Sequence, residues 1–188
     1  MAKRDLWPLQ LKISLSEVKP QIWRRVLVSS ETTLHELHRI IQMTFEWYDY
    51  HLYEFEIGDQ RYQRPDSESD AEDSTHARLR DLELAAGDAF TYLYDFGDSW
   101  MHRLQVERVP RRTDARRLPY VISGERRGPP EDCGGPGGFE RFLEAVRNPS
   151  HPEHHEYRAW VGDSYEPETF DLQTVRHAVL LAAAWGAR

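Results

Sequence analysis

Acidic residues and a histidine lie close together in one short segment, and they are the residues of this sequence best suited to chemistry. Asp95, Asp98 and His102 fall in or just beyond a predicted turn in YDFGDSWMH, residues 94–102. Glu131 and Asp132 form a second acidic motif further along the chain. Carboxylates and an imidazole can hold a divalent cation or share acid–base work if they converge. A metal-dependent hydrolase is therefore one function that the sequence allows.

The same residues have a structural interpretation, which we favour. Acidic residues are common in turns because their side chains accept hydrogen bonds from nearby backbone amides. In this interpretation Asp98 shapes the turn, Asp95 caps neighbouring backbone, and His102 packs among aromatic residues that include Trp100. We therefore predict no metal ligand and no cofactor, and we leave catalytic residues unassigned.

The acidic pair Glu131 and Asp132 lies inside PPEDCGG, residues 129–135. Its glycines would let backbone amides approach an anion, but the two carboxylates would oppose a phosphate. Cys133 is the only cysteine, so it cannot form an internal disulfide or a cysteine-rich zinc site. As a nucleophile it would need a base or a cation nearby. We favour a rigid loop that closes over the turn at residues 97–99.

Two groups of histidines suggest metal binding only weakly. His35 and His38 are three residues apart, which is not the spacing of the HExxH zinc motif. We predict that His38 is a packed or hydrogen-bonded histidine. The second group consists of His151, His154 and His155. A zinc site needs converging ligands, so we favour an exposed helical turn for this group.

A basic segment suggests a third function, nucleic-acid binding. Its arginines are Arg111, Arg112, Arg116 and Arg117. Aromatic residues that can stack on bases are Trp47, Tyr48 and Tyr50. The chain carries a net charge of −8, which repels a phosphate backbone on average. Nucleic acid is therefore a possible but disfavoured partner.

The composition is that of a folded soluble protein: 39% of the 188 residues are hydrophobic, 30% charged and 12% aromatic. This length predicts a single domain, residues 1–188. The acidic segment 65–76 is nearly free of apolar residues and is predicted to be a mobile surface loop. No apolar run is long enough to cross a bilayer and no signal peptide is visible, so we predict a cytoplasmic protein without a membrane partner.

Hydrophobic periodicity predicts strands first and helices late. Alternating apolar residues indicate strands at 9–15, 22–28, 50–57, 60–63 and 120–123. A helix is predicted from Thr33, with Glu36 completing a capping box, to about Glu46. Later helices are predicted at 139–147, 151–160 and from Asp171 to near Trp185. This order predicts an α+β fold: a mixed, mainly antiparallel sheet, or roll, covered by one N-terminal helix and a C-terminal helical cluster.

A central β-hairpin is predicted over residues 90–109. A three-residue loop at 97–99 would pair Phe96 with Trp100 and Tyr94 with His102. This register gathers apolar side chains on one face. It directs most polar ones, Asp95 among them, to the other face.

Two motifs give the chain a family resemblance. YDFGDSWMH at 94–102 and GERRGPPEDCGGPGGF at 124–139 resemble the plasmid pRiA4b ORF-3-like family, and IWRRVLV at 22–28 and PETFD at 167–171 follow the same order. The resemblance runs from about Leu9 to Trp185. It implies an α+β roll in a prokaryotic, soluble protein, often encoded on plasmids or carried with insertion elements, and it implies no particular reaction. The resolvase label of some members lacks support, because the serine and helix-turn-helix of a serine recombinase are not visible.

One departure from the family pattern concerns cysteine. The resemblance implies that many relatives have further cysteines near the positions of Ser123 and Gly128, in a cluster with Cys133, whereas this sequence has serine and glycine there. A cysteine-based metal or redox role therefore does not carry over to this chain.

The first hypothesis is a cytoplasmic binding or interaction module of this family, without a recognisable catalytic motif and with a protein partner. Its working surface would lie where the polar face of the hairpin meets PPEDCGG. The residues of this predicted surface are Asp95, Asp98, Trp100, His102, Glu131, Asp132 and Cys133. The alternatives are a metal-dependent hydrolase that uses the carboxylates and His102, and a nucleic-acid accessory protein of a mobile element that uses the arginines.

Overall fold

The fold is built on one open eight-stranded sheet. The computed structural model describes residues 7–65, 69–108, 118–162 and 164–185. Along the sheet the strand order is β5-β4-β3-β6-β7-β1-β2-β8. The strands are β1 (Pro8–Leu15), β2 (Trp23–Ser29), β3 (Tyr53–Ile57), β4 (Gln60–Gln63), β5 (Glu72–Asp73), β6 (Ala89–Tyr94), β7 (Trp100–Arg108) and β8 (Tyr120–Glu125). All neighbouring pairs are antiparallel except β4 and β5, which confirms the predicted mixed, mainly antiparallel sheet.

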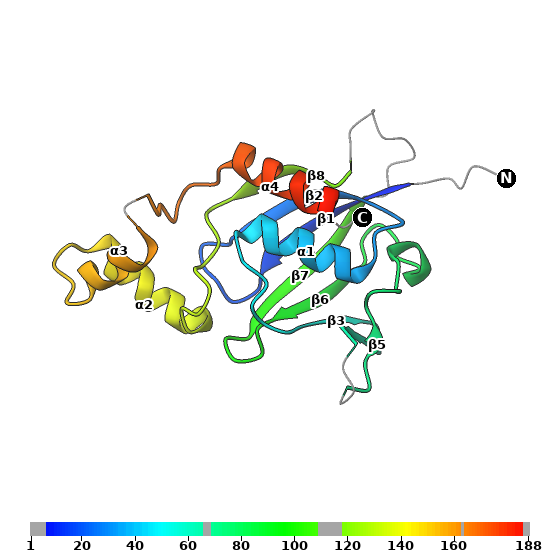
Figure 1. The fold of residues 1–188 in the computed structure, drawn as a ribbon, viewed down its shortest axis with the longest axis horizontal. Coiled ribbons are helices and arrows are strands. Elements are labelled where there is room, and N and C mark those ends of the chain that lie inside the picture. The colour runs from blue at the N-terminus through cyan, green and yellow to red at the C-terminus, as the bar shows by residue number, and fades with distance from the viewer. Residues whose placement is uncertain (1–6, 66–68, 109–117, 163, 186–188) are drawn as a thin grey trace.

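Helices lie on one face of the sheet and beyond one end of it (Figure 1). They are α1 (Leu34–Phe45), α2 (Gly135–Arg147), α3 (His154–Val161) and α4 (Leu172–Trp185), with a short 3-10 helix, η1 (Leu79–Leu82). The first helix lies across the strands with α4 packed against it, while α2 and α3 form a pair to the side. This confirms the α+β prediction. The second helix begins four residues before the predicted Phe139, because Gly134 precedes it and Pro136 is compatible with a first turn.

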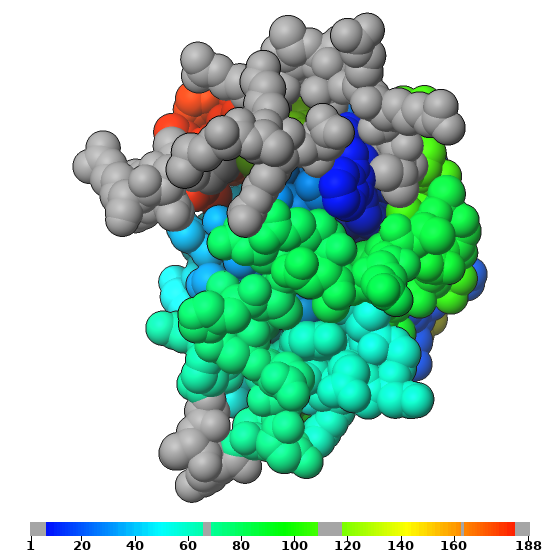
Figure 2. Space-filling model, turned by 90° about the vertical axis from the view of Figure 1, so that its right-hand side faces the viewer, coloured from blue at the N-terminus to red at the C-terminus, as the bar shows by residue number. Residues whose placement is uncertain are grey.

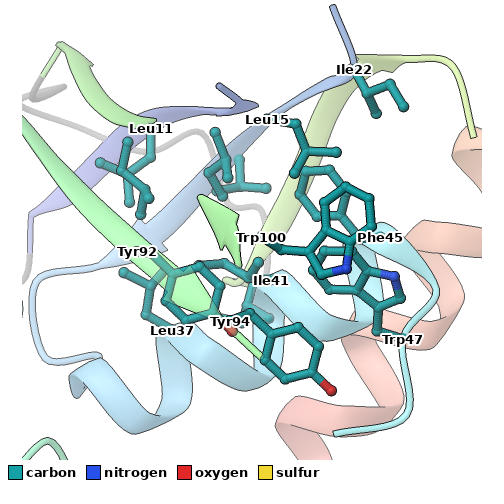
Figure 3. Packing of buried hydrophobic residues seen from close by; sticks show 14 of the residues in the cluster. Leu11, Leu15, Ile22, Leu37, Ile41, Phe45, Trp47, Tyr92, Tyr94 and Trp100 are labelled. Carbon is teal, nitrogen blue, oxygen red and sulfur yellow. The ribbon is translucent and has the colours of Figure 1, made fainter. Parts of the chain in front are cut away.

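The first helix is the element that the sequence specified best. Thr33 and Glu36 form the predicted capping box, and Glu46, directly after the last helical residue, adopts the left-handed conformation. Its apolar side packs on the sheet through residues such as Ile41 and Phe45, both fully buried (Figure 3). Burying one such side chain contributes roughly 1.5 to 3 kcal/mol, so this stripe holds α1 on the sheet.

The acidic segment 65–76 contains more structure than predicted. Within it, β5 pairs in parallel with β4, and Ser74 is fully buried with its hydroxyl 2.8 Å from that of Tyr53. Figure 2 shows this side of the molecule, whose surface is formed largely by the cyan-to-green part of the chain. Residues 66–68 lie outside the described residues, and the mobility of the segment stays a prediction.

The central hairpin forms, but the predicted register is wrong. Tyr94 pairs with Trp100 and Tyr92 with His102, so the loop comprises residues 95–99. Asp95 and Ser99 adopt left-handed conformations there, and Phe96 is 46% exposed. Because the shift is two residues, the predicted buried face is preserved: Tyr92, Tyr94 and His102 all point into the core. The alternation of side chains therefore predicted which residues face the core, whereas the length of the loop set which residues pair across the hairpin.

Among the described residues, none of the helices has both the length and the apolar character needed to span a bilayer.

Candidate functional site

Three segments meet where the hairpin ends. We call them the hairpin loop (residues 95–99), the aromatic segment (residues 47–52) and the proline loop (residues 128–134). The Trp47 indole N–H donates to the Pro129 carbonyl over 2.8 Å, and the Asp95 amide donates to the Leu52 carbonyl over 2.9 Å. The Gly134 amide donates to Asp98 Oδ2 over 3.0 Å. The proline loop thus closes over the hairpin as predicted.

Tyr94 joins these segments at the boundary of the core. Its ring is buried beside Trp47, whereas its hydroxyl points away from the aliphatic cluster (Figure 3). The hydroxyl donates to Glu131 Oε1 and accepts from the amides of Tyr50 and His51, at 3.1 and 3.4 Å. Burial and the nearby Glu131 carboxylate raise the pKa of Tyr94, so this hydroxyl stays protonated as a donor.

Asp95 has both a structural and a free carboxylate oxygen. Its Oδ1 accepts from the amides of Gly97 and Asp98 at 2.9 and 3.2 Å, which confirms the predicted capping of the turn. Its Oδ2 lies 3.6 Å from His51 Nε2, and Asp132 Oδ1 lies 2.9 Å from the same nitrogen. The hairpin loop and the proline loop therefore bring two predicted residues together around a third that sequence reasoning missed.

His51 carried no sequence signal for this role. It lies in the aromatic segment, 44 residues before Asp95 and 81 before Asp132. No spacing rule links residues so far apart, and neighbouring tyrosines suggested stacking instead. Only the closure of the proline loop over the hairpin brings the three side chains together.

His102 and Trp100 belong to the core instead. His102 is fully buried, its Nδ1 lies 3.0 Å from the Trp100 carbonyl oxygen, and its ring contacts Phe45, Trp47 and Tyr92. Burial lowers the pKa of His102 to about 3, so the imidazole is neutral at physiological pH. The packing of His102 among aromatic rings agrees with the structural interpretation.

Cys133 is a protonated thiol in this setting. Burial, together with the carboxylates of Asp98 and Asp132, raises its pKa to about 12. A thiol with so high a pKa contains almost no nucleophilic thiolate at neutral pH. The lone cysteine is therefore a packed side chain of the proline loop in this arrangement.

Two glycines allow the loops to approach closely. A Cβ on Gly128 would lie 2.2 Å from the Phe45 carbonyl oxygen, and one on Gly135 would lie 2.3 Å from that of Asp98. Neither position has room for a side chain. At the other family-specific position, the Ser123 hydroxyl accepts a hydrogen bond from Arg25. Serine and glycine at these positions therefore have local structural roles.

Two histidines from the predicted groups, His38 and His154, have hydrogen-bond partners within the fold. His38 is fully buried, with Nδ1 2.7 Å from the Tyr92 hydroxyl and Nε2 2.7 Å from Asp49, which confirms the prediction of a hydrogen-bonded histidine. His154 Nδ1 lies 2.8 Å from the Ala145 carbonyl. Among the described residues the one group able to hold a metal ion is His51, Asp95 and Asp132. Residues 109–117, with the four predicted arginines, lie outside the described part of the chain.

A groove lies beside Asp132, one of the three residues of this group. It has a volume of about 320 Å³ and lies between the aromatic segment, the proline loop and the end of α3. Tyr48 and Tyr50 stack with ring centroids 5.7 Å apart and are each 72% exposed, and Trp160 opposite is 47% exposed. The carboxylates of Glu131 and Asp132 line the groove. Arg127 also lines it, but its guanidinium is paired with Glu46 at 2.9 Å. The groove is therefore aromatic with an excess of negative charge.

The open, mainly antiparallel sheet with a helix across it defines an α+β fold. An aromatic, acidic groove lies at its hairpin end. The sequence pattern described as plasmid pRiA4b ORF-3-like protein matches residues 8–174, so the chain belongs to that family.

Two similar proteins extend this result. The uncharacterized protein y4hQ of Sinorhizobium fredii is 36% identical over 186 residues, covering 96% of this chain and 95% of that protein. The crystal structure of MM3350, a protein of unknown function from Methanosarcina mazei Go1, matches with a TM-score of 0.82 and 33% identity, covering 89% of this chain and 97% of that one. These relatives support the fold and assign no activity.

Proposed function

We propose that this chain is an interaction module that binds a segment of a partner protein in the groove beside the proline loop. The observation that carries the proposal is the convergence of Tyr48, Tyr50 and Trp160, all substantially exposed, on one groove. Tyrosine and tryptophan are the residues most enriched at interface hot spots, because they bury a large apolar area and retain a polar tip.

The groove also indicates the chemistry of the partner segment. Exposed aromatic rings suit proline and aliphatic side chains, which pack flat against them. Glu131 and Asp132 add negative charge, while Arg127 is already paired with Glu46. The occupant that fits is therefore a basic, proline-containing peptide segment. The same carboxylates oppose a phosphate backbone, which disfavours nucleic acid at this surface.

The structure gives less support to a metal-dependent hydrolase that uses the carboxylates together with His102. Of the predicted residues, His102 is packed in the core and Asp98 accepts from the Gly134 amide. Glu131 is bound by the Tyr94 hydroxyl and the Tyr48 amide. Asp95 and Asp132 alone face a shared third side chain, His51. A role for the arginines of residues 109–117 in nucleic-acid binding stays a prediction.

A displayed library of proline-containing peptides tests the proposal. The library would be selected on the wild-type protein, and enriched peptides would then be titrated against Tyr50→Ser and Trp160→Ala. We expect peptides that combine proline with lysine or arginine and that lose at least tenfold in affinity with either variant. Leu181→Ala is the control, because Leu181 is 54% exposed on α4 and does not line the groove.

Two outcomes would contradict the proposal. Peptides that bind wild type and both groove variants equally would place the binding surface elsewhere. A concentration-dependent dimer that Trp160→Ala abolishes, without peptide selection, would show that the occupant is a second copy of the chain.

A further inference from the structure

Three ligand-type atoms from distant parts of the chain converge beside the groove. His51 Nε2 lies 2.9 Å from Asp132 Oδ1 and 3.6 Å from Asp95 Oδ2, and all three atoms lie within 4.8 Å of one another. They come from the aromatic segment, the proline loop and the hairpin loop respectively. The site thus requires the tertiary contacts that join all three segments.

His51 Nε2, the nitrogen between the two carboxylates, has no hydrogen-bond partner among the described residues. This atom is buried, although the ring is 29% exposed and Asp132 lies close by. Buried polar atoms without partners are rare, and each calls for a physical explanation such as a bound ion. An unsatisfied imidazole nitrogen between two carboxylates is the arrangement that a cation would complete.

The surrounding hydrogen bonds orient these ligands. Asp95 Oδ1 is occupied by the amides of Gly97 and Asp98, which leaves Oδ2 free on the side of His51. The His51 amide donates to the Tyr94 hydroxyl, and the imidazole contacts the Tyr94 ring edge to face at 5.8 Å. Outer contacts of this kind fix ligands in metal sites.

We propose that His51, Asp95 and Asp132 form a binding site for a divalent transition-metal ion of the zinc type. Zinc bonds of about 2.0 to 2.2 Å in a tetrahedron separate ligand atoms by about 3.4 Å, and the observed 2.9 and 3.6 Å lie on either side of this value. The imidazole favours zinc over magnesium or calcium, which prefer oxygen ligands. Three protein ligands leave a fourth position open for water or for a group of a partner.

Such an ion would add a link between three loops that already contact one another through single hydrogen bonds such as those of Trp47 to Pro129 and Gly134 to Asp98. It would fix the aromatic segment, which carries Tyr48 and Tyr50, against the proline loop. Metal binding is measured without any partner, so this inference stands or fails separately from peptide binding in the groove.

Titration of chelator-treated protein with zinc chloride at pH 7 tests the site. We expect one zinc ion per chain by calorimetry and a melting temperature raised by about 5 °C or more at hundredfold excess over Kd. Magnesium and calcium chloride should give no comparable shift. Cobalt chloride should give the visible absorption of a low-symmetry cobalt centre.

Matched variants locate the ion. His51→Gln and Asp132→Asn should each weaken zinc binding at least tenfold and remove the cobalt absorption. His155→Gln, at an exposed histidine of α3, should change neither. Asp95→Asn is avoided because its Oδ1 also holds the hairpin loop. Absence of zinc binding, or equal zinc affinity in wild type and His51→Gln, would overturn the proposal and leave an ordinary imidazole–carboxylate contact.

Discussion

The two histidines next to the central hairpin tyrosines have opposite environments. His102 lies 5.2 Å from the Tyr92 ring, is fully buried, and has aromatic rings around it. The His51 ring lies 5.8 Å from the Tyr94 ring, is partly exposed, and has two carboxylates beside its buried Nε2. The first imidazole is held neutral by burial, whereas the second has carboxylate oxygens within 3.6 Å of its Nε2. Residue type alone therefore did not indicate which histidine lies beside ligand-type side chains and which is packed among aromatic rings.

Trp47→Ala is expected to have the largest effect, because Trp47 serves both environments. It packs against Phe45 and His102 in the core, and its indole N–H binds the Pro129 carbonyl of the proline loop. Removing a buried aromatic side chain costs about 3 to 5 kcal/mol in free energy of unfolding. Urea unfolding would measure this loss. Tyr48→Ala, at an exposed neighbour, should stay within about 0.5 kcal/mol, and a similar cost for both would show that Trp47 is not a core residue.

Lowering the pH should destabilise the folded protein through His102 at pH values where most carboxylates are still ionised. The unfolded chain binds a proton at His102 near pH 6.5, whereas burial keeps the folded pKa near 3. Stability is therefore lost as pH falls below 6.5, by up to about 1.4 kcal/mol per pH unit, or roughly 2 to 3 kcal/mol by pH 4.5. His38, whose pKa burial also lowers, adds to the same trend.

Urea unfolding of wild type and His102→Leu at several pH values between 7 and 4.5 separates these contributions. Whatever the stability of the variant at pH 7, it should depend less steeply on pH than that of the wild type. Identical slopes would mean that His102 gains a proton in the folded state without difficulty, and the contrast with His51 would fail.

Removing the hydroxyls of Tyr92 and Tyr94 in turn compares a buried hydrogen-bond network with one near solvent. Tyr92→Phe leaves two buried atoms, His38 Nδ1 and Gln42 Nε2, without the hydroxyl that they contact, which costs about 1 to 3 kcal/mol. Tyr94→Phe affects Glu131 and two loop amides near solvent, where water can substitute, so its cost should be about 1 kcal/mol or less. Chemical denaturation of both variants decides the order. A larger cost for Tyr94→Phe would indicate that the three loops, and not the core, limit stability.

His51→Gln should have the smallest effect on the metal-free protein. His51 is 29% exposed and Asp132 65% exposed, and ion pairs that keep such contact with solvent contribute about 0 to 1 kcal/mol. We expect its free energy of unfolding in chelator at pH 7 to match wild type within about 0.5 kcal/mol. A loss above 2 kcal/mol would assign His51 a structural role like that of His102.

The comparison also shows where sequence reasoning reached its limit in the hairpin. Alternation placed Tyr92, Tyr94 and His102 on the buried face correctly, because side chains in a strand alternate with a fixed period of two. The loop length was wrong by two residues, because Asp95 and Ser99 adopt left-handed conformations that only the packed loop stabilises. The predicted functional surface was likewise divided: Asp95 and Asp132 converge, while Trp100 and His102 lie in the core.

The sequence by itself determined the α+β class, the capped first helix and the family, since these depend on short-range periodicity, capping residues and contiguous motifs. It did not determine the meeting of His51, Asp95 and Asp132 or the groove of Tyr48, Tyr50 and Trp160. Those sites join residues that lie tens of positions apart. Close packing brings them together: Gly128 of the proline loop packs on α1, and Gly135 at the start of α2 packs on the hairpin loop. No local pattern encodes these contacts.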